Sequence, residues 1–157
     1  MFTLIHVVIS VLGIIAGLVV VGGLLAGARL NGWTGLFLAM TILTSVTGFG
    51  FPATTVTPAR VVGALSLVLL AICVAARYWK QLAGGWRTIY VITAVAALYL
   101  NVFVLVVQLF AKTPPLAQLA PTQQEPPFVV TQALVLALFA WLGWKALRAF
   151  RTEKSGG

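Results

Sequence analysis

The sequence predicts an all-α integral membrane protein, a bundle of five transmembrane helices in a single domain that covers residues 1–157. Its composition is the first reason: 61% of the residues are hydrophobic and 8% are charged, whereas about a quarter are charged in soluble proteins. The second reason is length. A hydrocarbon core about 30 Å thick requires roughly 20 residues of helix, and five apolar segments come close to that length.

The first segment covers residues 2–28 and resembles a secretory signal, because Ala26-Gly27-Ala28 has the small residues of a cleavage site. No basic residue precedes it, however, and its apolar stretch is longer than the core of a signal peptide. We therefore expect a retained membrane helix.

The other four segments follow at residues 33–51, 59–76, 88–110 and 128–147. Thr57-Pro58 precedes the third and has the pattern of a helix N-cap followed by proline at the first helical position. A proline-rich loop, residues 112–127, joins the last two segments, and proline should keep it ordered. A basic tail, residues 148–157, ends the chain.

The basic residues predict the orientation. No Lys or Arg precedes the first segment and Arg29 follows it, which places the N-terminus outside and the C-terminus in the cytoplasm. Only Arg60 and Lys112 then lie outside. The residues predicted inside are Arg29, Arg77, Lys80, Arg87, Lys145, Arg148, Arg151 and Lys154, together with all five tryptophans, Trp33, Trp79, Trp86, Trp141 and Trp144.

This arrangement predicts a multi-pass protein of the bacterial cytoplasmic (inner) membrane. The formal net charge of +8 is concentrated in short loops and in the tail, a pattern that favours anionic lipid headgroups on the cytoplasmic side over nucleic acid as the partner. A larger membrane complex or a homo-oligomer is a further expected partner.

Few residues are able to perform chemistry. Cys73 is the only cysteine, there is no aspartate, and both glutamates, Glu125 and Glu153, lie outside the apolar segments. A disulfide within the chain, a thiolate metal site and paired catalytic carboxylates are therefore excluded. We predict no catalytic residues, no metal and no cofactor, and a non-catalytic protein is favoured.

The first helix places His6, Ser10, Gly13 and Gly17 on one face, because their spacing is four, three and four. The small residues favour close approach of another helix. His6 has two interpretations: a hydrogen bond to a loop or a neighbouring helix, or a functional role as a haem or metal ligand or a proton-relay group. The first is favoured because haem ligation by two histidines would require a second copy of the chain.

Two further helices carry polar residues that are candidates for a cavity or for helix contacts. The second helix has Thr44 and Thr47 in a hydroxyl-rich stretch that also includes Thr41 and Ser45. The fourth has a single polar stripe, with Asn101 near mid-membrane. Its members are Thr93, Ala97, Asn101, Gln108 and Lys112.

The proline-rich loop follows this stripe, and Gln132 begins the fifth helix. If the loop folds over the bundle, Glu125 is able to pair with Lys112 or Arg60 above a polar vestibule. The alternative is a solvated surface pair, which contributes little to stability.

Three stretches carry a resemblance to known proteins: Thr44-Ser45-Val46-Thr47-Gly48-Phe49, Tyr99-Leu100-Asn101-Val102-Phe103, and residues 120–128. They resemble an uncharacterised family of small multi-spanning bacterial inner-membrane proteins, over most of the chain. The resemblance implies a membrane bundle and brings no activity. Chain length also invites comparison with the tryptophan-rich sensory proteins, but their outer-loop tryptophan and proline motif is missing.

Two functions are compatible with these residues. The favoured one is an accessory or partner-binding membrane component that presents the ordered outer loop. The alternative is a transporter or channel for a small neutral or lipophilic solute, with the candidate residues lining its path; a haem-binding redox protein is a minor alternative.

Overall fold

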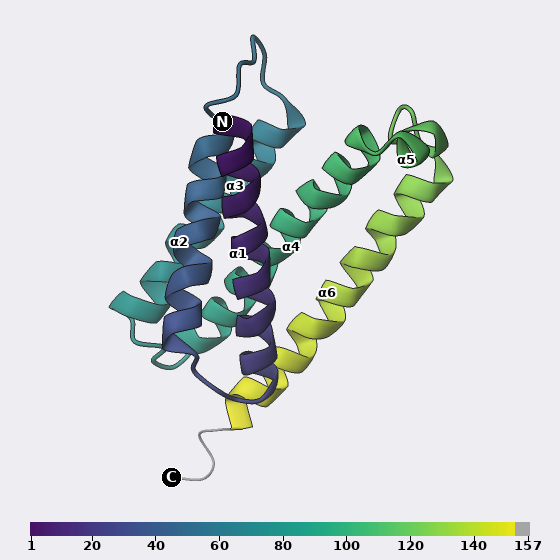
Figure 1. Cartoon of the computed structure of the whole chain (residues 1–157). Coiled ribbons are helices and arrows are strands. Elements are labelled where there is room, and N and C mark those ends of the chain that lie inside the picture. The colour runs from purple at the N-terminus through teal and green to yellow at the C-terminus, as the bar shows by residue number, and fades with distance from the viewer. Residues whose placement is uncertain (153–157) are drawn as a thin grey trace.

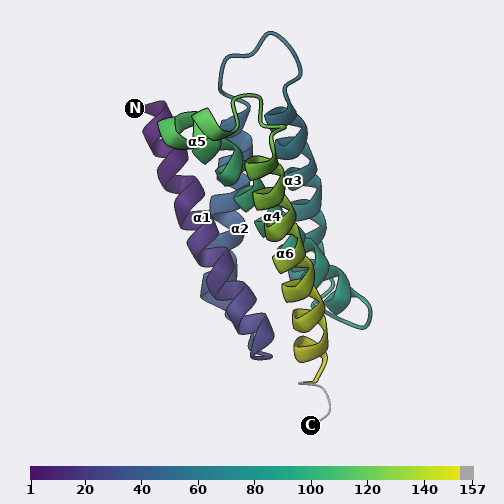
Figure 2. The same ribbon diagram turned by 90° about the vertical axis from the view of Figure 1, so that its right-hand side faces the viewer.

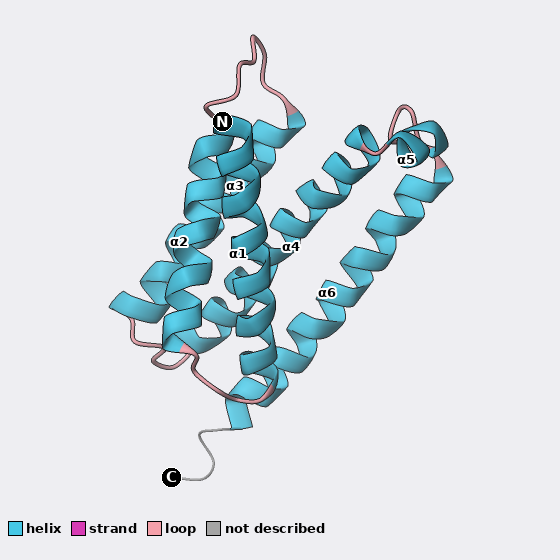
Figure 3. Ribbon diagram, viewed as in Figure 1, coloured by secondary structure: helices cyan, strands magenta, loops and turns pink. Residues whose placement is uncertain are grey.

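The computed structural model describes the backbone of residues 1–152 and the side chains of residues 1–150. All elements in this part are helices joined by loops (Figure 1, Figure 3). They are α1 (Phe2–Leu25), α2 (Asn31–Gly48), α3 (Pro58–Val74), the π-helical segment η1 (Ala75–Trp79), α4 (Trp86–Lys112), α5 (Pro114–Leu119) and α6 (Pro126–Thr152). Most of the predicted basic tail, residues 151–157, lies outside the described side chains.

The long helices alternate in direction along the chain, so Met1 lies at one end of the bundle and the end of α6 at the other (Figure 1). We call these the N-terminal and the C-terminal end. Figure 2 shows α5 and the loop between α2 and α3 together at the N-terminal end. The loops after α1 and after η1 lie at the C-terminal end.

The predicted all-helical fold is confirmed for the described residues, but the number of candidate spans differs. Four helices, rather than five, are long and apolar enough to cross a membrane by length and composition. The exception is α2, which has 18 residues and is too polar to qualify. Its polar residues are Asn31, Thr34, Thr41, Thr44, Ser45 and Thr47.

The predicted start of the third helix is confirmed. Thr57 is the N-cap of α3, its Oγ1 accepts a hydrogen bond from the backbone N–H of Arg60 at 3.3 Å, and Pro58 follows at the first helical position. The helix also extends beyond its predicted end, since the π-helical segment η1 continues it to Trp79. A π-helical segment changes the direction in which its side chains project.

The hydrophobic core is concentrated in the half of the bundle near the C-terminal end. On α1, every buried residue lies at or beyond Gly13, and none of residues 2–12 is buried. The fully buried large side chains of the core include Leu24, Phe37, Tyr90 and Phe150. Toward the N-terminal end, α4 and α6 tilt away from α1, α2 and α3 (Figure 1).

Two buried arginines connect helices at the C-terminal end. Arg77 of η1 donates a hydrogen bond to the side-chain oxygen of Asn31 at the start of α2, and its guanidinium lies 5.2 Å from the centre of the Tyr90 ring. Arg87 of α4 donates to the backbone oxygen of Phe150 at 3.0 Å and lies 5.0 Å from the centre of that ring. Carbonyl and aromatic groups therefore surround both charges.

The proline-rich loop contains the short helix α5, and it does not cover the bundle. Its helix α5 packs beside α4, and Ala120 forms a small second core with Val106 and Phe110 of α4. The amide of Gln123 donates to the backbone oxygen of Val107 at 3.0 Å. The loop is therefore fixed to α4 and α6 and lies to one side of α1, α2 and α3.

Candidate functional site

A cavity of about 500 Å³ lies at the N-terminal end, between α1, α2, α3 and α4. Its volume is within the range of small-molecule sites, about 300–1,000 Å³. The polar residues that line it are Thr3, His6, Ser10, Thr44, Ser45, Thr57, Arg60, Ser66, Asn101, Gln108, Lys112 and Thr113. The rest of the lining is mainly apolar, and it includes no carboxylate.

The cavity is deep. On α4 its lining runs from Lys112 at the rim to Asn101 near the floor, which corresponds to about 16 Å at 1.5 Å per residue. Below the floor, Gly17 of α1 packs tightly against Leu98 and Phe37, whose side chains are 0% and 1% exposed. The cavity thus reaches about half the depth of a hydrocarbon core and ends at a closed layer of side chains.

Polar atoms without partners lie at the floor, on Thr44 and Asn101, and behind it, on Thr41, which does not line the cavity. The hydroxyls of Thr41 and Thr44 and the side-chain nitrogen of Asn101 are buried and have no hydrogen-bond partner among the described residues. A Cβ atom at Gly13 would lie 3.3 Å from the Thr41 hydroxyl and 3.5 Å from the Asn101 nitrogen, so the glycine brings these groups close together. Unpaired buried polar groups are costly, and such groups beside a cavity indicate a polar ligand or solvent.

His6 occupies the upper wall and is held by its neighbours. Its Nδ1 lies 2.8 Å from the Thr47 hydroxyl, and its ring meets the ring of Phe51 edge-on at 5.1 Å. The hydroxyl of Ser10 donates to the backbone oxygen of His6. A hydrogen bond between α1 and α2 therefore orients the imidazole at the cavity wall.

The rim carries two cations. The Arg60 side chain donates to the backbone oxygen of Phe51 at 3.2 Å, which holds it beside the cavity. Lys112 lines the cavity from α4 and is exposed. Neither forms an ion pair with a carboxylate of the described residues.

One side of the cavity is apolar and open. Val7 and Val11 of α1 line it and are 45% and 42% exposed, while Leu105 and Leu109 of α4 line it and are 36% and 46% exposed. Residues that both line a cavity and face outward mark an edge where it meets the surroundings. The cavity therefore has a lateral edge between α1 and α4, in addition to the rim.

Five of the eight predicted site residues line this cavity. They are His6, Thr44, Asn101, Gln108 and Lys112. Thr47 lies behind His6 and orients it. Gln132 is elsewhere, on α6, where its side-chain nitrogen donates to the backbone oxygen of Phe103 at 3.2 Å. The polar stripe on α4 divides at the floor, because Thr93 and Ala97 are buried in the core.

The prediction that Glu125 pairs with Lys112 or Arg60 is wrong. Its carboxylate accepts hydrogen bonds from the Thr122 hydroxyl at 2.8 Å and from the Gln124 backbone N–H at 3.1 Å. Partial desolvation alone raises the pKa of Glu125, but these hydrogen bonds outweigh it and hold the pKa below its usual value. The loop thus satisfies its own carboxylate and leaves the rim cations without it.

Sequence reasoning missed the contribution of α3. Arg60, Gly63 and Ser66 all line the cavity from this helix. Their spacing of three places them near one another along the helix surface. This spacing is visible in the sequence and could have indicated a third polar face, although it is less polar than those of the other helices. Gly63 admits the ring of Phe49, since a Cβ there would lie 3.3 Å from the ring.

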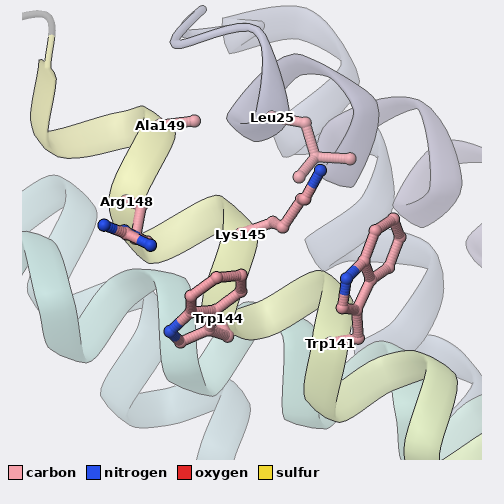
Figure 4. A pocket seen from close by; sticks show the side chains of 6 residues that line it. All are labelled: Leu25, Trp141, Trp144, Lys145, Arg148 and Ala149. Atoms are coloured by element: carbon pink, nitrogen blue, oxygen red, sulfur yellow. The ribbon is translucent and has the colours of Figure 1, made fainter.

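A second hollow, of about 740 Å³, lies on the surface at the C-terminal end (Figure 4). Apart from Leu25, its lining comes from α6 alone: Trp141, Trp144, Lys145, Arg148 and Ala149. The Lys145 ammonium and the Arg148 guanidinium each lie 4.8 Å from the centre of a tryptophan ring, those of Trp141 and Trp144. Cations on indole rings are typical of an interfacial anchor.

The chemistry available to the deep cavity is binding through hydrogen bonds, charge and apolar contact. Within the part of the chain that the structure describes, no three His, Cys, Asp or Glu side chains are grouped to hold a metal ion. A comparison with protein-family models, with curated proteins and with solved structures gives no match. The cavity itself is therefore the main guide to function.

Proposed function

We propose that this protein is a polytopic membrane protein that binds a small amphipathic solute in the deep cavity, as the binding step of a carrier. The observation that supports this most is the pair of lining residues Thr44 and Asn101, whose buried side-chain polar atoms have no hydrogen-bond partner among the described residues, beneath apolar walls. Such a surface complements a molecule that has both hydrogen-bonding and apolar parts. The closed floor at Phe37 and Leu98 favours a carrier over an open channel.

In our proposal the cavity opens to the outside of a bacterial inner membrane. Lysines and arginines are concentrated at the C-terminal end, and tryptophans accompany them, which supports a cytoplasmic location for that end. Anionic headgroups there would contact the basic and aromatic hollow on α6.

We also propose that α2 crosses the membrane inside the bundle. Although α2 is too polar to qualify alone, it packs extensively against α1 and also against α3. Thr34, Thr41 and Phe37 are each only 1% exposed, so its neighbours shield its polar groups from lipid. The N-terminus is then outside and the C-terminus inside. An accessory or partner-binding role for the ordered loop stays a prediction.

The proposal is tested by cysteine accessibility. Cys73 is 0% exposed, and a Cys73→Ala background removes the only thiol. In it, Ser66→Cys at the cavity should react with a membrane-impermeant methanethiosulfonate added to intact cells, whereas Ala83→Cys, in the exposed loop at the C-terminal end, should react only after permeabilisation. Hexadecanol and hexadecyl sulfate, added to the reconstituted protein, should slow the reaction of Ser66→Cys if either occupies the cavity.

Two controls make the result decisive. Val56→Cys, in the loop at the N-terminal end where Val56 is 78% exposed, reports reagent access without the cavity and should react whether or not amphiphile is present. Thr34→Cys should stay unreactive, because Thr34 lies outside the cavity and is 1% exposed. Reaction of Val56→Cys without any reaction of Ser66→Cys, or no protection by either amphiphile, would contradict the proposed function.

A further inference from the structure

We infer that the solute is an anionic amphiphile, whose head lies in the cavity between Arg60 and Lys112 and whose chain leaves between α1 and α4 into the outer leaflet. This inference rests on the proposed function and names the class of its ligand. It depends on two features of the cavity: the charge of its rim and the exposure of its apolar edge.

The rim charges are the first feature. Arg60 and Lys112 are the only two of the ten basic residues predicted on the outer side, and both line the same cavity from different helices. The positive-inside bias makes outer cations uncommon near membrane spans, so their meeting at one site indicates a role. Without a lining carboxylate, the site is electrostatically complementary to an anion.

The nearest candidate for an internal counter-ion is occupied. Glu125 is the one carboxylate of the described side chains, and its oxygens accept hydrogen bonds from Thr122 and Gln124 in its own loop. Arg60, for its part, is oriented by the backbone oxygen of Phe51. That bond uses one donor of a guanidinium that has five, and leaves others for a bound anion.

The apolar edge is the second feature, and it indicates that the ligand has an apolar chain. Leu105 and Leu109 lie above Asn101 on α4, by about 6 Å and 12 Å of helical rise, so a chain that leaves past them does not cover the polar floor. Val7 and Val11 form the facing side on α1. The head then stays beside Arg60 and Lys112 at the rim, above the polar floor, while the chain stays in lipid and loses little contact with it.

The route of entry follows from the same edge. In the half of α1 that precedes Gly13 no residue is buried, and α4 tilts away from α1 toward this end (Figure 1). A molecule that already lies in the outer leaflet therefore enters sideways, without removing its chain from the membrane. An anion dissolved in water would gain nothing from four exposed apolar side chains at the site.

The test uses three probes that share a hexadecyl chain with a photoactivatable diazirine and differ in head: sulfate, hydroxyl and trimethylammonium. The full-length protein is reconstituted in phosphatidylcholine nanodiscs, and crosslinking is measured by intact mass and peptide mapping. We expect the sulfate to crosslink about tenfold more than the alcohol, because a charge-assisted hydrogen bond contributes at least that factor, and the cation less than either. Crosslinks should map to α1 and α4 near Val11 and Leu105.

Arg60→Gln combined with Lys112→Gln should lower sulfate crosslinking to the level of the alcohol and leave the alcohol unchanged. The matched control combines Arg29→Gln with Lys145→Gln, which removes the same charge at the C-terminal end and should have no effect. Phosphatidylglycerol added to the nanodiscs should compete if the natural ligand is a membrane lipid; competition by soluble decyl sulfate alone would assign a free amphiphile. Either result supports an anionic ligand.

The two proposals fail differently. Equal crosslinking of sulfate and alcohol in the cavity, insensitive to the double substitution, would overturn the anionic ligand and leave the proposed binding function standing. Absence of crosslinks from α1 and α4 with all three probes would overturn both. Folding of each variant is checked by its elution as the wild-type species and by unchanged helical circular dichroism.

Discussion

Replacing Gly17 with leucine is expected to destabilise the protein by about 3 kcal/mol, the upper end of the usual range for overpacking. A Cβ atom at this position would already lie 2.6 Å from Leu98 Cδ1 and 3.0 Å from the Phe37 ring. Both side chains are fully buried, so neither has free space to move into. The rest of a leucine side chain would force α1 away from α2 and α4.

The measurement is the free energy of unfolding in mixed micelles, followed by circular dichroism. Gly22→Leu is the matched control, because Gly22 is exposed on the same helix and a Cβ there meets nothing within 4 Å. It should be neutral, or more stable by up to about 1 kcal/mol from helix propensity. Equal stability of the two variants would mean that α1 does not pack at Gly17 as described.

Replacing Arg87 with alanine should lower the free energy of unfolding by about 2–3 kcal/mol. Arg87 is 9% exposed, and the hydrogen bond of its guanidinium joins α4 to the Phe150 carbonyl near the end of α6. Charge-assisted hydrogen bonds contribute about 1.5–3 kcal/mol, and their loss leaves a buried acceptor unpaired. A cation also interacts favourably with carbonyls at a helix C-terminus.

Arg29→Ala provides the comparison, because Arg29 is exposed at the same end of the bundle, and its loss should change stability by less than about 0.5 kcal/mol. Arg87→Lys should recover part of the loss, since it keeps the charge but not the planar donor geometry. A loss with Arg87→Ala no larger than with Arg29→Ala would show that the bond to Phe150 contributes nothing.

The helices were predictable from sequence because their apolar composition is a local property. Thr57-Pro58 predicted the start of α3 for the same reason, as a cap depends on residues within one turn. The helix α2 is not among the four candidate spans because its hydroxyls lower its mean hydropathy. Its neighbours bury those hydroxyls, and such burial depends on contacts between segments distant in sequence.

The cavity was predictable only in part. The spacing on α4 placed Asn101, Gln108 and Lys112 on one face, and all three line the cavity. Spacing within one helix does not show how deeply each residue is buried by the neighbouring helices. The sequence therefore could not show that Thr93 and Ala97 lie in the core while Asn101, Gln108 and Lys112 line the cavity. The position of Glu125 depended on the turn formed by residues 120–125, whose local hydrogen bonds compete with any longer contact.

The uneven distribution of the core has a mechanical consequence. The buried residues of α1 begin at Gly13. A displacement of its first three turns would break no core contact, whereas a displacement of its last three turns would break several. Local opening is easiest where buried apolar contacts are fewest. Local opening is therefore expected first between α1 and α4 at the N-terminal end, and the small residues at positions 13 and 17 mark where the core contacts of α1 begin.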